Sequence, residues 1–210
     1  MSVIVVGLDQ HNTSLDLLER VAVAEEMLPK ALEELRSRVP ASELVVVSTC
    51  LRTELYAVVD RFHEGVERLH EYLADRAGCS VDELMSSVRV LFDDAVATHL
   101  FEVASGLRSA VIGETEVLGQ VRRAVEVAEA ERAAGPVLSG LFRRAVQVGR
   151  RVRSATAIAR GTTSLSHVAV ELAEACLGTL AGRNIVVVGA GEMGESMIGA
   201  LRGRAPGARI

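Results

Sequence analysis

Apolar and polar residues in the N-terminal part of the chain follow patterns that predict alternating strands and helices. Four short apolar runs predict strands, at residues 3–8, 43–48, 54–59 and 88–92. Apolar residues recur at helical spacing within residues 14–38, between the first two strands, and within residues 63–77, between the last two. Residues 49–53 form a short connection between the second and third strands.

Residues at the ends of these elements support the same arrangement. Pro40 ends the first helical segment, because proline disfavours helix at the residue before it. Gly78 is placed to end the second helix, and the S-x-x-E pattern at 80–83 is typical of a capping box. Asp93 and Asp94 follow the fourth strand in position to cap another helix. The order β-α-β-β-α-β is that of a ferredoxin-like α+β domain.

The rest of the chain is predicted to be almost entirely helical. Helical spacing recurs over residues 95–104, 116–133, 137–154 and 165–180. We expect the last helix to bury the stripe formed by Val168, Ala169, Leu172, Ala175 and Cys176. A short apolar run at 184–188 predicts one more strand. Gly and Thr interrupt the pattern around 157–163, so we expect one complete domain over residues 1–158 and the first part of a Rossmann-like α/β domain over residues 159–210.

Composition places the chain among globular proteins. It has 210 residues, of which 49% are hydrophobic and 3% aromatic, and its formal net charge is −5. These values exclude a disordered chain and binding to nucleic acid by bulk charge, so any such contact must be local. No stretch approaches the ~18 apolar residues of a membrane helix, and the N-terminus lacks the basic region of a signal peptide. We therefore expect a cytoplasmic protein.

A glycine motif follows the last predicted strand directly. Gly189, Gly191 and Gly194 form G-x-G-x-x-G at the start of a predicted helix, the context in which dinucleotides bind. The first glycine permits a tight turn, the second lets the backbone approach a pyrophosphate, and the third lets the helix pack closely. The alternative is a glycine-rich turn without a ligand. The acidic residue expected about 20 residues later cannot be checked, because the sequence ends at Ile210.

Cys50 is the strongest candidate for chemistry among the three cysteines. It follows a strand and lies two residues before Arg52, so a nearby cation and partial exposure would favour the thiolate. The alternative is a buried core cysteine, which is the commonest environment of a free thiol. Cys79 and Cys176 are interpreted as structural. The cysteines have no CxxC spacing and the histidines no metal-ligand spacing, so no disulfide or metal site is expected.

Three further polar features are open to two interpretations each. His99 is either an acid or base near neutral pH or a helix histidine with satisfied hydrogen bonds. Glu114 and Glu116 precede a predicted helix and either belong to a functional site or simply favour the helix N-terminus electrostatically. The main basic group either contacts phosphates or forms a solvated helix face, and it consists of Arg143, Arg144, Arg150, Arg151 and Arg153.

Taken together, four motifs resemble the glutamyl-tRNA reductase family. They are S-T-C-L-R-T-E-L-Y (48–56), H-L-F-E-V-A-S-G-L (99–107), S-A-V-I-G-E (109–114) with G-Q-V-R (119–122), and G-A-G-E-M-G (189–194). The resemblance runs from residue 3 to the end of the sequence. It implies NADPH-dependent reduction of glutamyl-tRNA to glutamate-1-semialdehyde, through a thioester on the motif cysteine. This is the first step of C5 tetrapyrrole biosynthesis.

The resemblance also implies roles for individual residues. Cys50 would be the nucleophile, with His99 beside it, and Arg52 would hold the substrate glutamate. Other substrate positions fall on Thr49, Leu51, Ser109, Glu114, Thr115, Glu116 and Gln120. NADPH would bind at Gly189, Ala190, Gly191, Glu192, Met193 and Gly194. The implied partners are glutamyl-tRNA and the downstream aminomutase, without a membrane. The family dimerises through a region that is absent from this sequence.

The sequence departs from the family pattern at three positions near these motifs and in length. Leu51 stands where the family usually has Asn, Arg108 where it has Asp, and Ala155 where it has Glu. A doubly wound domain needs several more β-α units, so we expect a truncated chain that forms and hydrolyses the thioester without full reductase turnover. One alternative is a degenerate, non-enzymatic homologue that binds charged tRNA or a partner protein. Another is an unrelated NAD(P) dehydrogenase.

Overall fold

The structure is a computed structural model that describes residues 1–158, 165–189 and 191–210. The fold is mixed α+β, as expected, and the chain divides into two compact units, Met1–Ile158 and Ala159–Ile210. Each unit has its own hydrophobic core. None of the helices in the described ranges is both long and apolar enough to cross a membrane.

The first unit is built on a four-stranded antiparallel sheet in the order β2-β3-β1-β4. Its strands are β1 (Ser2–Asp9), β2 (Ala41–Thr49), β3 (Arg52–Val59) and β4 (Arg89–Phe92), so the four strands predicted in this unit are confirmed. β3 lies between two neighbours, and all eight of its residues are buried. β2 and β3 extend further than predicted, because Thr49 pairs with Arg52 and only Cys50 and Leu51 remain in the turn.

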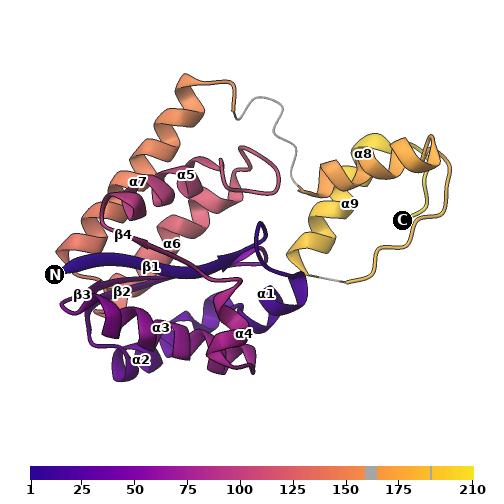
Figure 1. The fold of residues 1–210 in the computed structure, drawn as a ribbon. Helices are drawn as coiled ribbons and strands as arrows, with labels where there is room; N and C mark the ends of the chain where they lie inside the picture. The colour runs from indigo at the N-terminus through magenta and orange to yellow at the C-terminus, as the bar shows by residue number, and fades with distance from the viewer. Residues whose placement is uncertain (159–164, 190) are drawn as a thin grey trace. The chain divides into compact units, whose positions relative to one another are not determined.

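One face of this sheet is covered by α1 (Leu15–Val21), α2 (Leu28–Arg38), α3 (Phe62–Ala77) and α4 (Val81–Met85), with a short 3₁₀ turn at Glu25–Met27 (Figure 1). α3 ends at Gly78, which adopts the left-handed conformation with φ +65°. Ser80 and Glu83 form the expected capping box at the start of α4. Asp93 does not cap the next helix through its side chain, because its carboxylate accepts a hydrogen bond from the Val3 amide instead.

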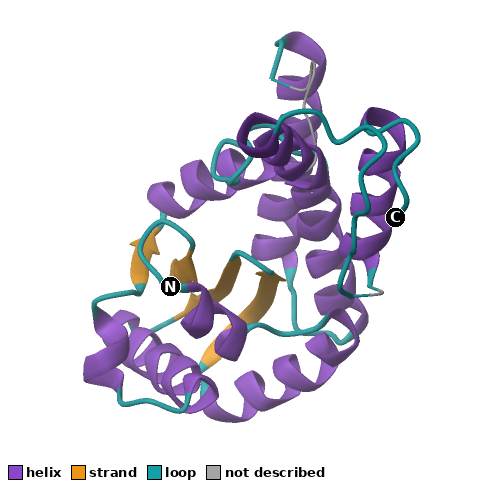
Figure 2. Cartoon of the chain, turned by 90° about the vertical axis from the view of Figure 1, so that its right-hand side faces the viewer, coloured by secondary structure: helices purple, strands orange, loops and turns teal. Residues whose placement is uncertain are grey.

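The other face is covered by α5 (Asp94–Ser105), α6 (Glu116–Ala130) and α7 (Pro136–Ala155), so the strands lie between two helical layers (Figures 1 and 2). A buried carboxylate fixes α7 to the sheet. Glu43 of β2 accepts hydrogen bonds from the amides of Val137 and Leu138, at 3.0 and 2.6 Å. These amides have no partner inside the helix, and the negative charge also suits the helix N-terminus. This anchor was not predicted from the sequence.

The second unit consists of α8 (Leu165–Leu177) and α9 (Glu192–Arg204) with the segment that joins them. The strand predicted at 184–188 is wrong. Within the described residues, only Asn184 makes a ladder contact in this segment, as an isolated bridge to Arg209. Val186 and Val188 are 85% and 94% exposed. An apolar run becomes a strand only when another strand pairs along it, and among the described residues the pairing is confined to Arg209, whose carbonyl accepts a hydrogen bond from the Ile185 amide at 2.8 Å.

The buried face of α8 also differs from the prediction. Val168, Leu172 and Cys176 are exposed, whereas Val170 is buried and Ala173 packs against the small core that includes residues of α9. α8 carries apolar residues on more than one face, so helical spacing alone did not decide which face packs inward. The structural role predicted for Cys176 is therefore wrong, while Cys79 is half-buried against the main core.

Candidate active site

Cys50 lies in the turn between β2 and β3, which is held on both sides. The Leu51 amide donates a hydrogen bond to Thr49 Oγ1 at 3.1 Å, and the Gln10 amide donates one to the Leu51 carbonyl at 3.1 Å. Leu51 and Thr49 are half-buried, but Cys50 is exposed. The interpretation of Cys50 as a buried core cysteine is therefore excluded, and the thiol is presented on a well-defined backbone.

Directly after this turn, a buried carboxylate gathers three donors. Arg52, Glu54 and Tyr56 alternate along β3, so their side chains share one face of the sheet. Glu54 Oε1 accepts hydrogen bonds from Arg52 Nη1 at 2.9 Å and from His99 Nε2 at 2.8 Å, and Oε2 accepts one from the Tyr56 hydroxyl at 2.7 Å. The network thus joins β3 to His99 of α5.

The charge of Glu54 follows from these contacts. Burial would raise its pKa, but the hydrogen bond from His99 and the positive charge of Arg52 outweigh burial and lower the pKa to about 2. Glu54 is therefore ionised at neutral pH and neutralises Arg52 at close range. Burial, followed by the charge of Glu54, raises the pKa of Tyr56 well above its usual value, so this hydroxyl remains a donor.

A glycine in the neighbouring strand makes room for Glu54. Gly7 of β1 lies opposite Glu54 in the sheet, and a Cβ at this position would lie 2.6 Å from the Thr53 carbonyl oxygen and 2.9 Å from Glu54 Cγ. Glycine weakens a strand, so its presence here indicates that the close approach matters. No role was predicted for Gly7, Glu54 or Tyr56, although polar residues at every second position of a buried strand were a usable signal.

The loop between α5 and α6 lies against this network. The Arg108 carbonyl accepts a hydrogen bond from Arg52 Nη2 at 2.6 Å. Gly113, with φ +84°, donates its amide to the Gly106 carbonyl at 2.9 Å, which folds the loop back on itself. Ser109 is buried, and its side chain acts to lower the pKa of Glu114. Several candidate substrate residues are therefore brought beside Arg52 by contacts distant in sequence.

The environment of the Cys50 thiol is acidic. Partial burial of the sulfur is the largest cause that raises its pKa, and the negative charges of Glu114 and Glu116 add to it, while a backbone hydrogen bond opposes them. The expectation that Arg52 favours the thiolate is therefore wrong, because Arg52 is already paired with Glu54. Burial and the negative charge of Glu116 also raise the pKa of Glu114. Ser109, Arg52 and Arg153 oppose this effect by lowering the same pKa.

The other predicted residues are less closely joined. In the part of the chain that the structure describes, no hydrogen bond or ion pair links His99 to Cys50, since His99 Nε2 is bound to Glu54 and Nδ1 has no partner. Thr115, Glu116 and Gln120 are exposed at the start of α6. Arg108, the charge reversal, pairs with Glu102 of α5 at 2.7 Å. Within the same ranges, no group of three or more possible metal ligands is present.

The glycine motif lies in the second unit, on exposed backbone. Gly189 has φ +113°, Gly191 is the N-cap of α9, and a Cβ on Gly194 would lie 2.5 Å from the Gly189 carbonyl oxygen. These three features permit a tight turn and a close helix. Met193 is exposed, α9 begins at Glu192, and Ala190 lies outside the described residues. A helix start with exposed amides suits a phosphate group.

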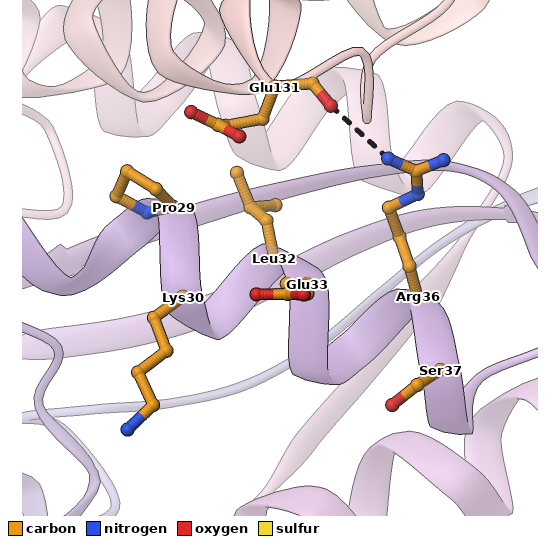
Figure 3. Close-up of a pocket in the computed structure, with 7 residues that line it drawn as sticks. All are labelled: Pro29, Lys30, Leu32, Glu33, Arg36, Ser37 and Glu131. Atoms are coloured by element: carbon orange, nitrogen blue, oxygen red, sulfur yellow. Dashed lines mark hydrogen bonds between the residues drawn. The ribbon is translucent and has the colours of Figure 1, made fainter.

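A separate groove lies on α2 and does not belong to this site (Figure 3). Its wall includes Lys30, Glu33 and Arg36 of α2 and, after α6, Glu131, whose carbonyl accepts a hydrogen bond from Arg36 Nη1 at 3.2 Å. It shares no residue with the Cys50 turn. Its mixed charges do not indicate one class of ligand.

Comparisons with known proteins point to one family. Residues 6–156 match the family model described as the glutamyl-tRNA(Glu) reductase N-terminal domain. Glutamyl-tRNA reductase of Bacillus subtilis is 40% identical over 207 residues, which are 99% of this chain and 46% of that protein. The Geobacillus kaustophilus protein of the same name is 39% identical over 194 residues, or 92% of this chain and 43% of that protein.

A solved structure gives the same result. Glutamyl-tRNA reductase from Methanopyrus kandleri matches with a TM-score of 0.63 and 32% identity, over 97% of this chain and 47% of that one. The chain thus spans about half the length of the relatives it matches. With the family model covering most of its residues, the chain belongs to the glutamyl-tRNA reductase family.

Proposed function

We propose that this chain carries the acylation site of a glutamyl-tRNA reductase, in which Cys50 receives the glutamyl group of glutamyl-tRNA. The observation that carries the proposal is the exposed thiol of Cys50 on a fixed turn, directly before the buried Arg52–Glu54–His99 network. The whole reaction would be the NADPH-dependent formation of glutamate-1-semialdehyde, the first step of tetrapyrrole synthesis by the C5 route.

The acylation step follows from the chemistry of the thiol. Cys50 loses its proton, and the sulfur attacks the ester carbonyl carbon of the glutamyl group. A C–S bond forms as the C–O bond to the tRNA ribose breaks, and the tRNA leaves with a protonated hydroxyl. In the absence of a hydride donor, water attacks the thioester, which releases glutamate and restores the thiol. His99 is the candidate for moving a proton in these steps.

The charges around Cys50 suit the two ends of a glutamyl substrate. Arg52 is the candidate for binding the side-chain carboxylate of glutamate, because its guanidinium is a planar donor. Its Nη1 and Nη2 already donate to Glu54 and to the Arg108 carbonyl, so the substrate would use the remaining N–H groups. Glu114 and Glu116 act on the thiol electrostatically, and the substrate's ammonium group lies one carbon from the carbonyl that is attacked. This ammonium would neutralise the acidic pair, so the pKa of Cys50 should fall when the substrate binds. Thr49, Leu51, Ser109, Thr115 and Gln120 are the remaining candidates for the pocket.

For the reducing step, we propose that NADPH binds through its pyrophosphate at the start of α9. The tight turn at Gly189 and the absence of room for a side chain on Gly194 fit such a group. When bound, this cofactor supplies a hydride to the acyl carbon. The candidate backbone contacts run from Gly189 through Ala190 and Gly191 to Gly194, with Glu192 and Met193 between them.

The two units would then be a catalytic domain over residues 1–158 and part of an NADPH-binding domain over residues 159–210. The strand order β2-β3-β1-β4 supports a ferredoxin-like description of the first unit. The glycine turn before α9 supports a Rossmann-like description of the second. The aldehyde product would pass to the aminomutase of the same route.

A deacylation assay tests the function of Cys50. The chain is mixed with radiolabelled glutamyl-tRNA without NADPH, and free glutamate is measured. We expect Cys50→Ser to reduce the rate at least ~100-fold, whereas Cys79→Ser and Cys176→Ser should leave it within about twofold. Equal rates for wild type and Cys50→Ser would contradict the proposal. Binding of glutamyl-tRNA without thiol-dependent release would instead support a non-enzymatic binding module.

A further inference from the structure

Arg153 near the end of α7 turns its side chain inward, unlike its basic neighbours. Its Nη1 donates hydrogen bonds to the carbonyls of Ala104 at 2.6 Å and Gly149 at 3.2 Å, and its Nη2 donates one to the Glu114 carbonyl at 2.7 Å. Arg150 and Arg151 on the same helix are exposed. Arg153 therefore does not belong to a solvated basic face.

Partial burial of this cation is costly for the fold, although carbonyl oxygens accept its hydrogen bonds. Partial burial lowers the pKa of Arg153, while the negative charge of Glu114 acts to raise it. Its Nε is buried without a partner in the described residues. The helices meet tightly here, because a Cβ on Gly149 would lie 2.5 Å from the Ala104 carbonyl oxygen. An apolar side chain would avoid the cost of a partly desolvated cation, so packing alone does not explain an arginine.

The contacts of Arg153 and Arg52 together explain why an arginine stands at position 153. Arg52 of β3 holds the carbonyl of Arg108, and Arg153 of α7 holds the carbonyl of Glu114. The α5–α6 loop is thus fixed near both ends by guanidinium groups from two different elements. Ser109 and Glu114, two of the candidate substrate residues, lie within the fixed stretch.

We propose that Arg153 is a positioning residue, which fixes the main chain at Glu114 so that the Glu114 carboxylate stays beside the Cys50 turn. Its effect on substrate rests on the proposed function, in which Glu114 binds the ammonium of the glutamyl group. Its effect on the free thiol does not, because the charge of Glu114 acts on Cys50 without substrate. The same arrangement can therefore be tested in two independent ways.

The first test measures alkylation of Cys50 by iodoacetamide between pH 7 and 10.5, with Cys79 and Cys176 replaced by Ser. The carboxylates that act on the thiol are Glu114 and Glu116, and Glu114 is in turn influenced by Arg52 and Arg153. Glu114→Gln should speed alkylation near pH 7.5 about threefold, because it removes a charge that disfavours the thiolate. Arg153→Lys keeps the positive charge but loses the planar guanidinium that binds two separate carbonyls, so it should speed alkylation about twofold. Arg150→Lys is the matched control and should have no effect.

Two further measurements distinguish a positioning role of Arg153 from a general loosening of the structure in its variant. Near pH 10.5, where the thiol is ionised in each variant, the rates should converge. In a Glu114→Gln background, Arg153→Lys should add no further change, because its effect passes through Glu114. A lower melting temperature for Arg153→Lys with an unchanged alkylation profile would overturn the proposal, as would a twofold effect that persists without the Glu114 carboxylate.

The second test uses deacylation of glutamyl-tRNA. Arg153→Lys should lower kcat/KM about tenfold, mainly through KM, since the ammonium of the substrate loses a fixed partner. If wild type shows no deacylation but the alkylation effects are present, the proposed function fails while the positioning role stands. If wild type is active and Arg153→Lys leaves both KM and the alkylation profile unchanged, the positioning role fails alone.

Discussion

The two candidate sites of this chain are built in different ways. Beside the Cys50 turn, side chains of β3 and α5 meet the main chain of the α5–α6 loop, and the charges of Arg52 and Glu54 are buried and paired. At the glycine turn before α9, the candidate site consists of backbone rather than side chains, and Gly189 and Gly191 are exposed. The first site depends on contacts between distant residues, whereas the second depends on local conformation. Substitutions should therefore act on them through different physical causes.

The largest expected effect is on the charge network. Glu54→Ala leaves Arg52 and His99 buried without their acceptor, so we expect the free energy of unfolding to fall by about 3–5 kcal/mol. Tyr56→Phe removes only one donor to the same carboxylate and should cost about 1–2 kcal/mol. Urea denaturation followed by circular dichroism measures both. Equal costs for the two variants would mean that Glu54 does not hold Arg52 and His99 in place.

Acid should reveal the same network. The pKa of Glu54 is about 2 in the folded chain and 4.5 when unperturbed. Because folding lowers this pKa, the carboxylate stabilises the fold above about pH 4.5, and the contribution is lost as the pH falls toward 2. Between pH 5 and 2, wild type should lose ~3 kcal/mol more than Glu54→Gln. Parallel pH profiles of unfolding free energy for the two proteins would show that Glu54 is not stabilised as an anion.

The glycine turn should respond to smaller changes in shape. Gly194→Ala places a Cβ 2.5 Å from the Gly189 carbonyl oxygen, so it should destabilise the second unit by about 1–3 kcal/mol. Gly199→Ala is the matched control on α9, because its Cβ meets nothing within 4 Å. It should stabilise the helix by about 0.5–1 kcal/mol. Hydrogen exchange of the α9 amides measures both, and equal protection in the two variants would contradict the close approach.

The same contrast explains what the sequence could predict. The four strands of the first unit, the left-handed Gly78 and the Ser80–Glu83 capping box follow from local pattern and turn chemistry, and they are confirmed. Residues 184–188 have an equally strong apolar pattern, but a strand needs a partner that pattern does not provide. The inward face of α8 was likewise undecided, because its apolar residues are not confined to one stripe.

Single residues of the candidate site were predictable from the sequence, but the contacts between them were not. The motif around Cys50 marked the turn, and Cys50 is an exposed residue there. The pairing of Arg52 with Glu54, which leaves the thiol under the influence of Glu114 and Glu116, depends on how β3, α5 and the α5–α6 loop pack together. The room that Gly7 provides for Glu54 depends on strand register. The contacts of Arg52 with the Arg108 carbonyl, of Glu54 with His99 and of Glu54 with Gly7 join residues that are far apart in the sequence, so periodicity carries no information about them.

The central claim is that Cys50 takes up the glutamyl group, and the acyl-enzyme itself tests it most directly. The chain is incubated briefly with glutamyl-tRNA without NADPH, quenched in acid, and analysed by mass spectrometry after digestion. We predict one glutamyl adduct, on the peptide that contains Cys50, and none in Cys50→Ser. Release of glutamate with no adduct on Cys50, or an adduct on Cys79 or Cys176 instead, would contradict the claim.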